Sequence, residues 1–190
     1  MGVFNNIEQA VINAVNAHFT VTTEDGPENV LANVEGISGD LNAEALDKSR
    51  KMMPGVFVRL YDIGQVNDHG DAETKWLLFP IAGSAGGENA RRKGTKTSIG
   101  IYELVEKLLQ LNSKPLVWDG NVIGTISIGK AQALYASKLK DKGAEVWSLE
   151  MSLTIQLPNQ DLSLDPFVTF AADYQMSNGE EVQETIELEQ

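Results

Sequence analysis

The chain has 190 residues, of which 42% are hydrophobic, and it carries 15 basic residues, 27 acidic residues and no cysteine. The absence of cysteine excludes disulfides, thiol catalysis and cysteine zinc sites, and it suits a reducing cytoplasm. No apolar run is long enough to predict a transmembrane helix, and the N-terminus lacks the basic and apolar segments of a signal peptide, so secretion is not expected.

The acidity is concentrated at the C-terminus. From Pro158 onward there are eight acidic residues and no Lys or Arg, whereas the preceding 157 residues carry 15 basic and 19 acidic groups, a net charge of −4. Without a generally basic surface, a nucleic-acid-binding protein is disfavoured. We therefore expect an α+β core domain over residues 1–157 and an acidic C-terminal extension over residues 158–190.

In the first part of the chain, apolar residues at helical spacing predict an amphipathic helix over residues 4–19. The stretch TEDGPEN then predicts a break. Residues 40–53 could form a short second helix, which Pro54-Gly55 would end.

Two β-rich stretches follow, VFVRLYD (56–62) and TKWLLFPIAG (74–83). We expect them to form an antiparallel pair around a polar turn. Pro80 has no amide hydrogen to donate, which indicates an edge strand or a bulge.

The next stretch is a Gly-rich basic loop over residues 83–98, of which residues 83–96 are expected to be mobile in the free protein and ordered only in the assembly. The clearest helix is predicted over residues 97–111, with Thr97 or Ser98 as its cap. Residues 116–135 predict a short strand, an Asp-Gly turn and a long extended stretch with a bulge near Gly129.

The most regular stretch is the run from Trp147 to Leu157. Odd positions are apolar and even positions between them are polar, over eleven residues. This alternation predicts a long strand whose odd face packs on the helices and whose even face meets solvent or another chain. The fold class expected is α+β, with a largely antiparallel twisted sheet and two main helices packed on one face. Trp76, Trp118 and Trp147 fall on predicted strands, as core or interface residues.

No motif predicts catalysis. The Gly-rich loop lacks the Gly-Lys-Ser/Thr ending of a phosphate-binding loop, and NDHGDAE is better explained as a polar hairpin turn than as a metal site. The sequence has no cysteine and only two histidines, far apart, so it offers few residues for a catalytic triad. We therefore expect that the protein is not an enzyme and binds no metal or cofactor. The loop's cations are either part of a surface loop or a docking site for an acidic partner: Arg91, Arg92, Lys93 and Lys96.

The C-terminal extension contains DPFVTFAADYQ, which places aromatic anchors beside acidic residues. These anchors could pack on the chain's own sheet or on a neighbouring subunit or sheath protein. The charge asymmetry favours a partner. The interface residues expected here are Phe167, Phe170, Asp173 and Tyr174.

Several stretches resemble the tail terminator proteins of contractile-tailed, Mu-like bacteriophages. MMPGVFVRLYDIG is similar to the family's Pro-led strand, and ARRKG before IGIYELVEKLLQL is similar to its variable loop and central helix. AEVWSLEMSLTIQLP and LDPFVTFAADYQM are similar to its last segments. The likeness covers roughly residues 4–190, with a longer GSAGGENARRKG insertion and a more acidic end.

The resemblance implies a structural protein that forms a homohexameric ring on the finished tail tube and stops its polymerisation. The implied partners are the tail tube protein, the tail sheath protein and the head–tail neck proteins, with DNA passing through the ring. It implies a virion tail location after assembly in the host cytoplasm, and no membrane or sequence-specific nucleic-acid binding. The alternatives are another neck or tail-completion protein, or a small cytoplasmic anion-binding protein that uses the Gly-rich basic loop.

Overall fold

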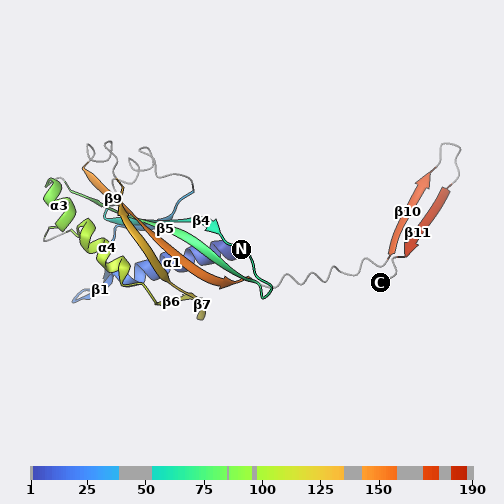
Figure 1. The fold of residues 1–190 in the computed structure, drawn as a ribbon, viewed down its shortest axis with the longest axis horizontal. Coiled ribbons are helices and arrows are strands. Elements are labelled where there is room, and N and C mark those ends of the chain that lie inside the picture. The colour runs from blue at the N-terminus through green and yellow to red at the C-terminus, as the bar shows by residue number, and fades with distance from the viewer. Residues whose placement is uncertain are drawn as a thin grey trace. The chain divides into compact units, whose positions relative to one another are not determined.

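A computed structural model of the chain describes residues 2–38, 53–84, 86–95, 98–134 and 143–157, and the backbone of residues 169–175 and 181–187. Its centre is a five-stranded sheet in the order β3-β4-β5-β9-β8, in which β3 and β4 run parallel and all other neighbours run antiparallel (Figure 1). The strands are β3 (Asn33–Gly36), β4 (Gly55–Ile63), β5 (Asp71–Gly83), β8 (Ser127–Ala133) and β9 (Ala144–Gln156). The expected α+β class with a largely antiparallel sheet is confirmed.

Two helices pack on the same face of this sheet: α1 (Val3–Phe19) and α4 (Ile101–Leu109) (Figure 1). Their apolar stripes enter one core with the odd residues of β9 because residues three and four apart share one side of a helix. The helical residues that this core buries include Ile7, Val11, Val15, Ile101, Leu104 and Leu108.

The long strand is confirmed, since β9 contains thirteen residues. Leu149, Met151, Leu153 and Ile155 are buried on the helix side, and Trp147 is half-buried. The opposite face changes character along its length. Near Val146 it holds a smaller apolar cluster with Phe57, Phe79 and Ile81, and toward Gln156 it is polar and exposed.

Pro80 does not lie at an edge, because β5 is the middle strand of the sheet, so the edge alternative of that prediction is wrong. Pro80 pairs with Val56 of β4, while the ladder to β9 is interrupted between Leu78 and Ile81. The missing amide hydrogen therefore falls where the β5–β9 pairing has a gap. The bulge expected near Gly129 is confirmed between Ile128 and Ala131 of β8.

Two short hairpins flank the core. The TEDGPEN stretch, where a break is predicted, contains the turn of a hairpin formed by β1 (Thr20–Thr23) and β2 (Gly26–Asn29). The other hairpin joins β6 (Pro115–Trp118) and β7 (Asn121–Thr125) through Asp119 and Gly120, both with positive φ. This is the expected Asp-Gly turn, which suits the twist of a hairpin.

Two local expectations differ from the structure, and one lies outside it. Helix α4 begins after Gly100 with no side-chain cap, so Ser98 does not cap it, and Thr97 is not among the described residues. Residues 88–93 form a helix, α3 (Glu88–Lys93), within the stretch expected to be a loop. The short helix expected over residues 40–53 falls almost entirely outside the described residues.

The chain divides into two compact units, Met1–Leu157 and Pro158–Gln190. The second unit contains a seven-pair antiparallel hairpin of β10 (Thr169–Gln175) and β11 (Glu181–Glu187).

Candidate partner-binding surfaces

The basic residues expected to bind a partner are divided between two roles. Arg92 donates hydrogen bonds from Nε and Nη2 to the Tyr102 hydroxyl, and its guanidinium carbon lies 5.0 Å from the Tyr102 ring centre. These hydrogen bonds raise the pKa of Arg92. Tyr102 in turn meets Trp147 edge-on, with ring centres 6.2 Å apart. Arg92 therefore connects α3 to α4 and, through Tyr102, to β9. Its guanidinium group is used in contacts within the subunit.

The other basic residues of this segment differ in their exposure to a binding partner. Lys93 is exposed and Arg91 is half-buried, while Lys96 lies outside the described residues. The helix is short and polar, and it buries none of its residues. The contact of Arg92 with Tyr102 therefore joins α3 to α4 in place of a packed apolar helix face.

A hollow of about 440 Å³ opens between α1 and the start of β6. Its α1 side includes Ala14 and His18, and its opposite side includes Lys114 and Val117. Burial lowers the pKa of His18, and a hydrogen bond with the Lys107 backbone partly opposes this. Nε2 of His18 is buried and has no hydrogen-bond partner. The neutral ring is therefore the form that suits this site.

Two exposed valines extend this hollow along the β6–β7 hairpin. Val117 and Val122 face each other across the two strands, and they are 48% and 65% exposed. Lys114, also exposed, makes no ion pair with any described residue. We call the hollow with Lys114, Val117 and Val122 the basic hollow.

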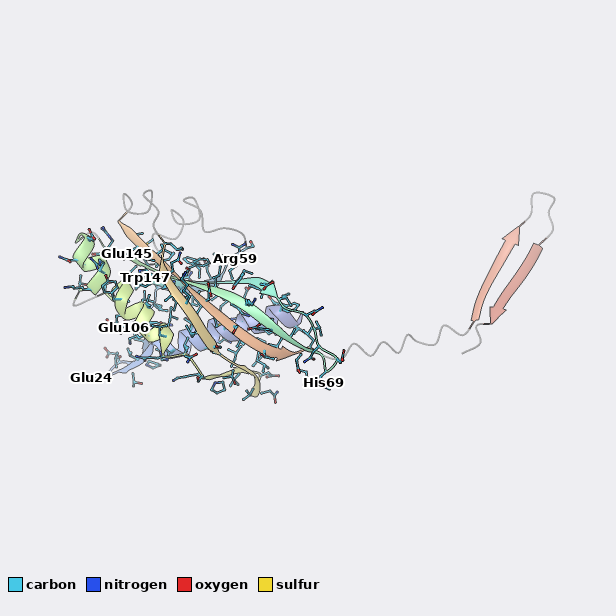
Figure 2. All side chains as sticks on the ribbon, viewed as in Figure 1. Glu24, Arg59, His69, Glu106, Glu145 and Trp147 are labelled. Atoms are coloured by element: carbon cyan, nitrogen blue, oxygen red, sulfur yellow. The ribbon has the colours of Figure 1, made fainter. Side chains whose placement is uncertain are left out.

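A second exposed surface lies at the turn between β4 and β5, where His69 is labelled in Figure 2. Ile63 and Val66 are 43% and 52% exposed, and Asp68 is exposed beside them in the sequence. Asn67 Oδ1 accepts hydrogen bonds from the backbone amides of His69 and Asp71, which fixes the turn. We call Ile63, Val66, Asp68 and Asp71 the acidic turn. The polar-turn interpretation of NDHGDAE agrees with this geometry.

The open face of the sheet has a smaller hollow of about 190 Å³, lined by residues that include Tyr61, Lys75, Ser127 and Glu150. Lys75 Nζ lies 3.1 Å from Asp62 Oδ2, and this hydrogen-bonded pair raises the pKa of Lys75. Both charges of this pair are satisfied across neighbouring strands, so the carboxylates of Glu73 and Glu150, which also line the hollow, give it a negative charge.

The C-terminal residues expected at an interface lie partly outside the described chain. Phe167 is not described, while Phe170, Asp173 and Tyr174 are in β10. The register pairs Phe170 with Ile186 and Tyr174 with Val182. Because strand residues two and four apart share a face, these four positions lie on one face of the hairpin, and Asp173 lies on the other.

Sequence reasoning missed the two exposed surfaces. The signal for Val117 and Val122 is present in LVWDGNV, because an Asp-Gly turn places them at facing positions. Nothing in the sequence shows that this side of the hairpin stays uncovered.

Within the described segments, no three His, Asp or Glu side chains gather closely enough to hold a metal ion. No described helix is both long and apolar enough to cross a membrane.

A search of curated proteins found no match to the chain. The family described as "Bacteriophage Mu, Gp37" matches residues 3–156. This match covers most of the chain and ends at Gln156, the last residue of β9. The match covers all the strands of the five-stranded sheet together with the helices on it. The chain therefore belongs to the bacteriophage Mu Gp37 family and is a protein of a Mu-like phage.

Proposed function

We propose that this protein is a tail terminator, a structural virion protein that forms a homohexameric ring on the tail tube. The ring ends tube polymerisation and offers a surface to the sheath and to the head–neck proteins. The observation that carries the proposal is the family match over residues 3–156, together with the likeness of four stretches of the chain to tail terminators.

The surfaces of the core unit support a ring. A cyclic assembly needs two different patches on each subunit, one for each neighbour. The core unit carries an apolar patch beside an unpaired lysine and another apolar patch beside aspartates. These two patches differ in charge, which suits a head-to-tail contact between them.

We propose further partner contacts for two other segments. Arg91 and Lys93 on α3, with Lys96, would bind an acidic partner. The extension over residues 158–190 would bind a cationic partner such as the sheath through Phe167, Phe170 and Tyr174 and through its carboxylates, which include Asp173. A two-stranded hairpin is marginal alone in water, which favours a bound state for this one.

The alternatives remain another neck or tail-completion protein, and a small anion-binding protein that uses the basic loop. The engagement of Arg92 by Tyr102 weighs against the anion site, because it removes one cation from the loop.

The test is electron microscopy of phage that lacks this protein. A terminator predicts tails of uncontrolled length, or tails without heads, and a return to normal tails when the protein is supplied from a plasmid. Tails of normal length that fail only to join heads would instead favour the neck alternative. Normal particles would exclude both structural roles.

The C-terminal contact is tested separately with a chain truncated after Pro158. Normal folding with failed sheath joining supports the partner contact. Loss of cooperative unfolding would show that residues 159–190 are needed for the fold of the subunit itself.

A further inference from the structure

We propose that the basic hollow of one copy binds the acidic turn of a second copy, so that these two surfaces form the contact between successive subunits. This inference rests on the proposed ring, and it names the surfaces that would build it.

The first argument is that each surface combines exposed apolar side chains with charge of one sign. Val117 and Val122 lie beside Lys114, and Ile63 and Val66 lie beside Asp68. Exposed apolar groups next to a charge are typical of interface patches, in which the apolar part is buried and the charge sets the orientation.

The second argument is that two neighbouring charges of opposite sign, Lys75 and Glu103, are already paired. Lys75 Nζ lies 3.1 Å from Asp62 Oδ2, so this lysine of β5 is paired with Asp62 and does not neutralise Asp68 or Asp71. Beside the basic hollow, Lys107 Nζ lies 3.9 Å from Glu103 Oε1. The carboxylate of Glu103 is therefore paired with Lys107 and not with Lys114. Asp68 and Asp71 give the turn its negative charge. Lys114 places a positive charge in the hollow itself, and the carboxylate of Asp119 lies farther along, at the tip of the β6–β7 hairpin.

The third argument is that both surfaces are preorganised. Asn67 holds the acidic turn through the amides of His69 and Asp71, and its own amide nitrogen donates to Asp71 Oδ2 at 3.1 Å. The positive φ angles of Asp119 and Gly120 close the β6–β7 hairpin tightly. A fixed surface loses less conformational entropy on binding than a flexible one.

The two surfaces are placed on different parts of one unit. The hollow is lined by α1 and β6, and the turn joins β4 to β5. No hydrogen bond or ion pair among the described residues joins them. Two different complementary patches on one rigid unit make a head-to-tail contact, which closes into a ring when the rotation permits.

The contact is tested by disulfide trapping, for which a chain without cysteine is well suited. Val122→Cys and Val66→Cys are made as separate single variants and mixed under mild oxidation. The expected product is a disulfide dimer that contains one of each variant. A chain with both substitutions should give a ladder of covalent oligomers. Val21→Cys, an exposed valine on β1 outside both surfaces, replaces Val66→Cys in the control mixture.

Charge exchange provides the second test. Lys114→Glu and Asp68→Lys should each weaken self-association at least about tenfold, measured by sedimentation, because each sets like charges against each other. An equal mixture of the two should associate about as well as the wild type, since every contact in an alternating assembly then joins opposite charges. Lys130→Glu, on the exposed edge strand β8, is the matched reversal and should have little effect.

The outcomes separate this contact from the terminator role. A wild-type ring that gives no mixed disulfide and tolerates both reversals would overturn the hollow–turn contact and leave the ring standing. A mixed disulfide in a protein whose loss leaves tail length normal would support the contact and contradict the terminator role. A wild type that stays monomeric and gives no disulfide, in solution and in particles, would overturn the contact.

Discussion

Trp76 Nε1 donates a 2.9 Å hydrogen bond to Thr74 Oγ1, and both side chains are fully buried on the helix side of β5. The threonine hydroxyl donates in turn to the Leu153 carbonyl oxygen at 3.2 Å. Since Trp76 is among the largest fully buried side chains, this short chain of hydrogen bonds satisfies the one polar atom that it brings into the core.

Thr74→Val is therefore expected to destabilise the core unit by about 1–3 kcal/mol, because it keeps the shape but leaves the indole N–H unpaired. Urea unfolding measures the change. Thr74→Ser retains the hydroxyl and should recover much of the loss. Equal stability of the valine variant and the wild type would mean that Trp76 finds another acceptor.

Leu153→Ala in β9 is expected to cost about 2–5 kcal/mol, the usual range for truncating a buried leucine. Leu153 is 1% exposed and packs in the main core with the helices. Thr154→Ala, at the next and exposed position of the same strand, should change the free energy of unfolding by no more than about 0.5 kcal/mol. Similar costs for the two variants would contradict the two-faced strand.

The alternation that predicts β9 and the helical spacing that predicts α1 and α4 identify most of the core, because burial follows these periods directly. The period does not predict the middle position of β5 in the sheet. Pro80 points to an edge on propensity alone, but a gap in the ladder to β9 accommodates it. The contact of Arg92 with Tyr102 also cannot be predicted from the sequence, because it depends on how α3 packs against α4.

The connection between α3 and α4 depends on two glycines in close approach. A Cβ added to Gly100 would lie 2.2 Å from the backbone nitrogen of Gly94, and Gly94 itself has a φ of 81°. Gly100→Ala should force the two segments apart and destabilise the unit by about 1–3 kcal/mol. Gly2→Ala, where nothing lies within 4 Å, is the control for a change without a clash, and because Gly2 is the N-cap of α1 it should cost no more than about 1 kcal/mol. Thermal unfolding distinguishes them, and a neutral Gly100→Ala would show that the connection can relax.

Arg92 is expected to control the order of α3. Arg92→Lys keeps the charge but loses the paired hydrogen bonds to Tyr102 and the flat contact with its ring. Backbone amides of α3 should then exchange with solvent several-fold faster, while amides of β5 and β9 stay protected. Arg91→Lys, one position earlier on the same helix, is the matched control. Equal exchange in the two variants would remove Arg92 from this role.

His18 should make the stability of the core unit depend on pH. Burial lowers its pKa from the unfolded value of 6.5, so the unfolded chain binds a proton more readily than the folded one. The stabilising contribution of the neutral ring is complete above about pH 6.5 and is lost as the pH falls through the lower folded pKa. Urea midpoints measured between about pH 7.5 and 5.5 should therefore fall more steeply for the wild type than for His18→Gln, which has no imidazole to protonate. The absolute stability of His18→Gln is not the readout, because the substitution also removes an edge-on contact with Phe19. If His18→Gln and the wild type lose stability in parallel over this range, the titration of His18 is not linked to folding.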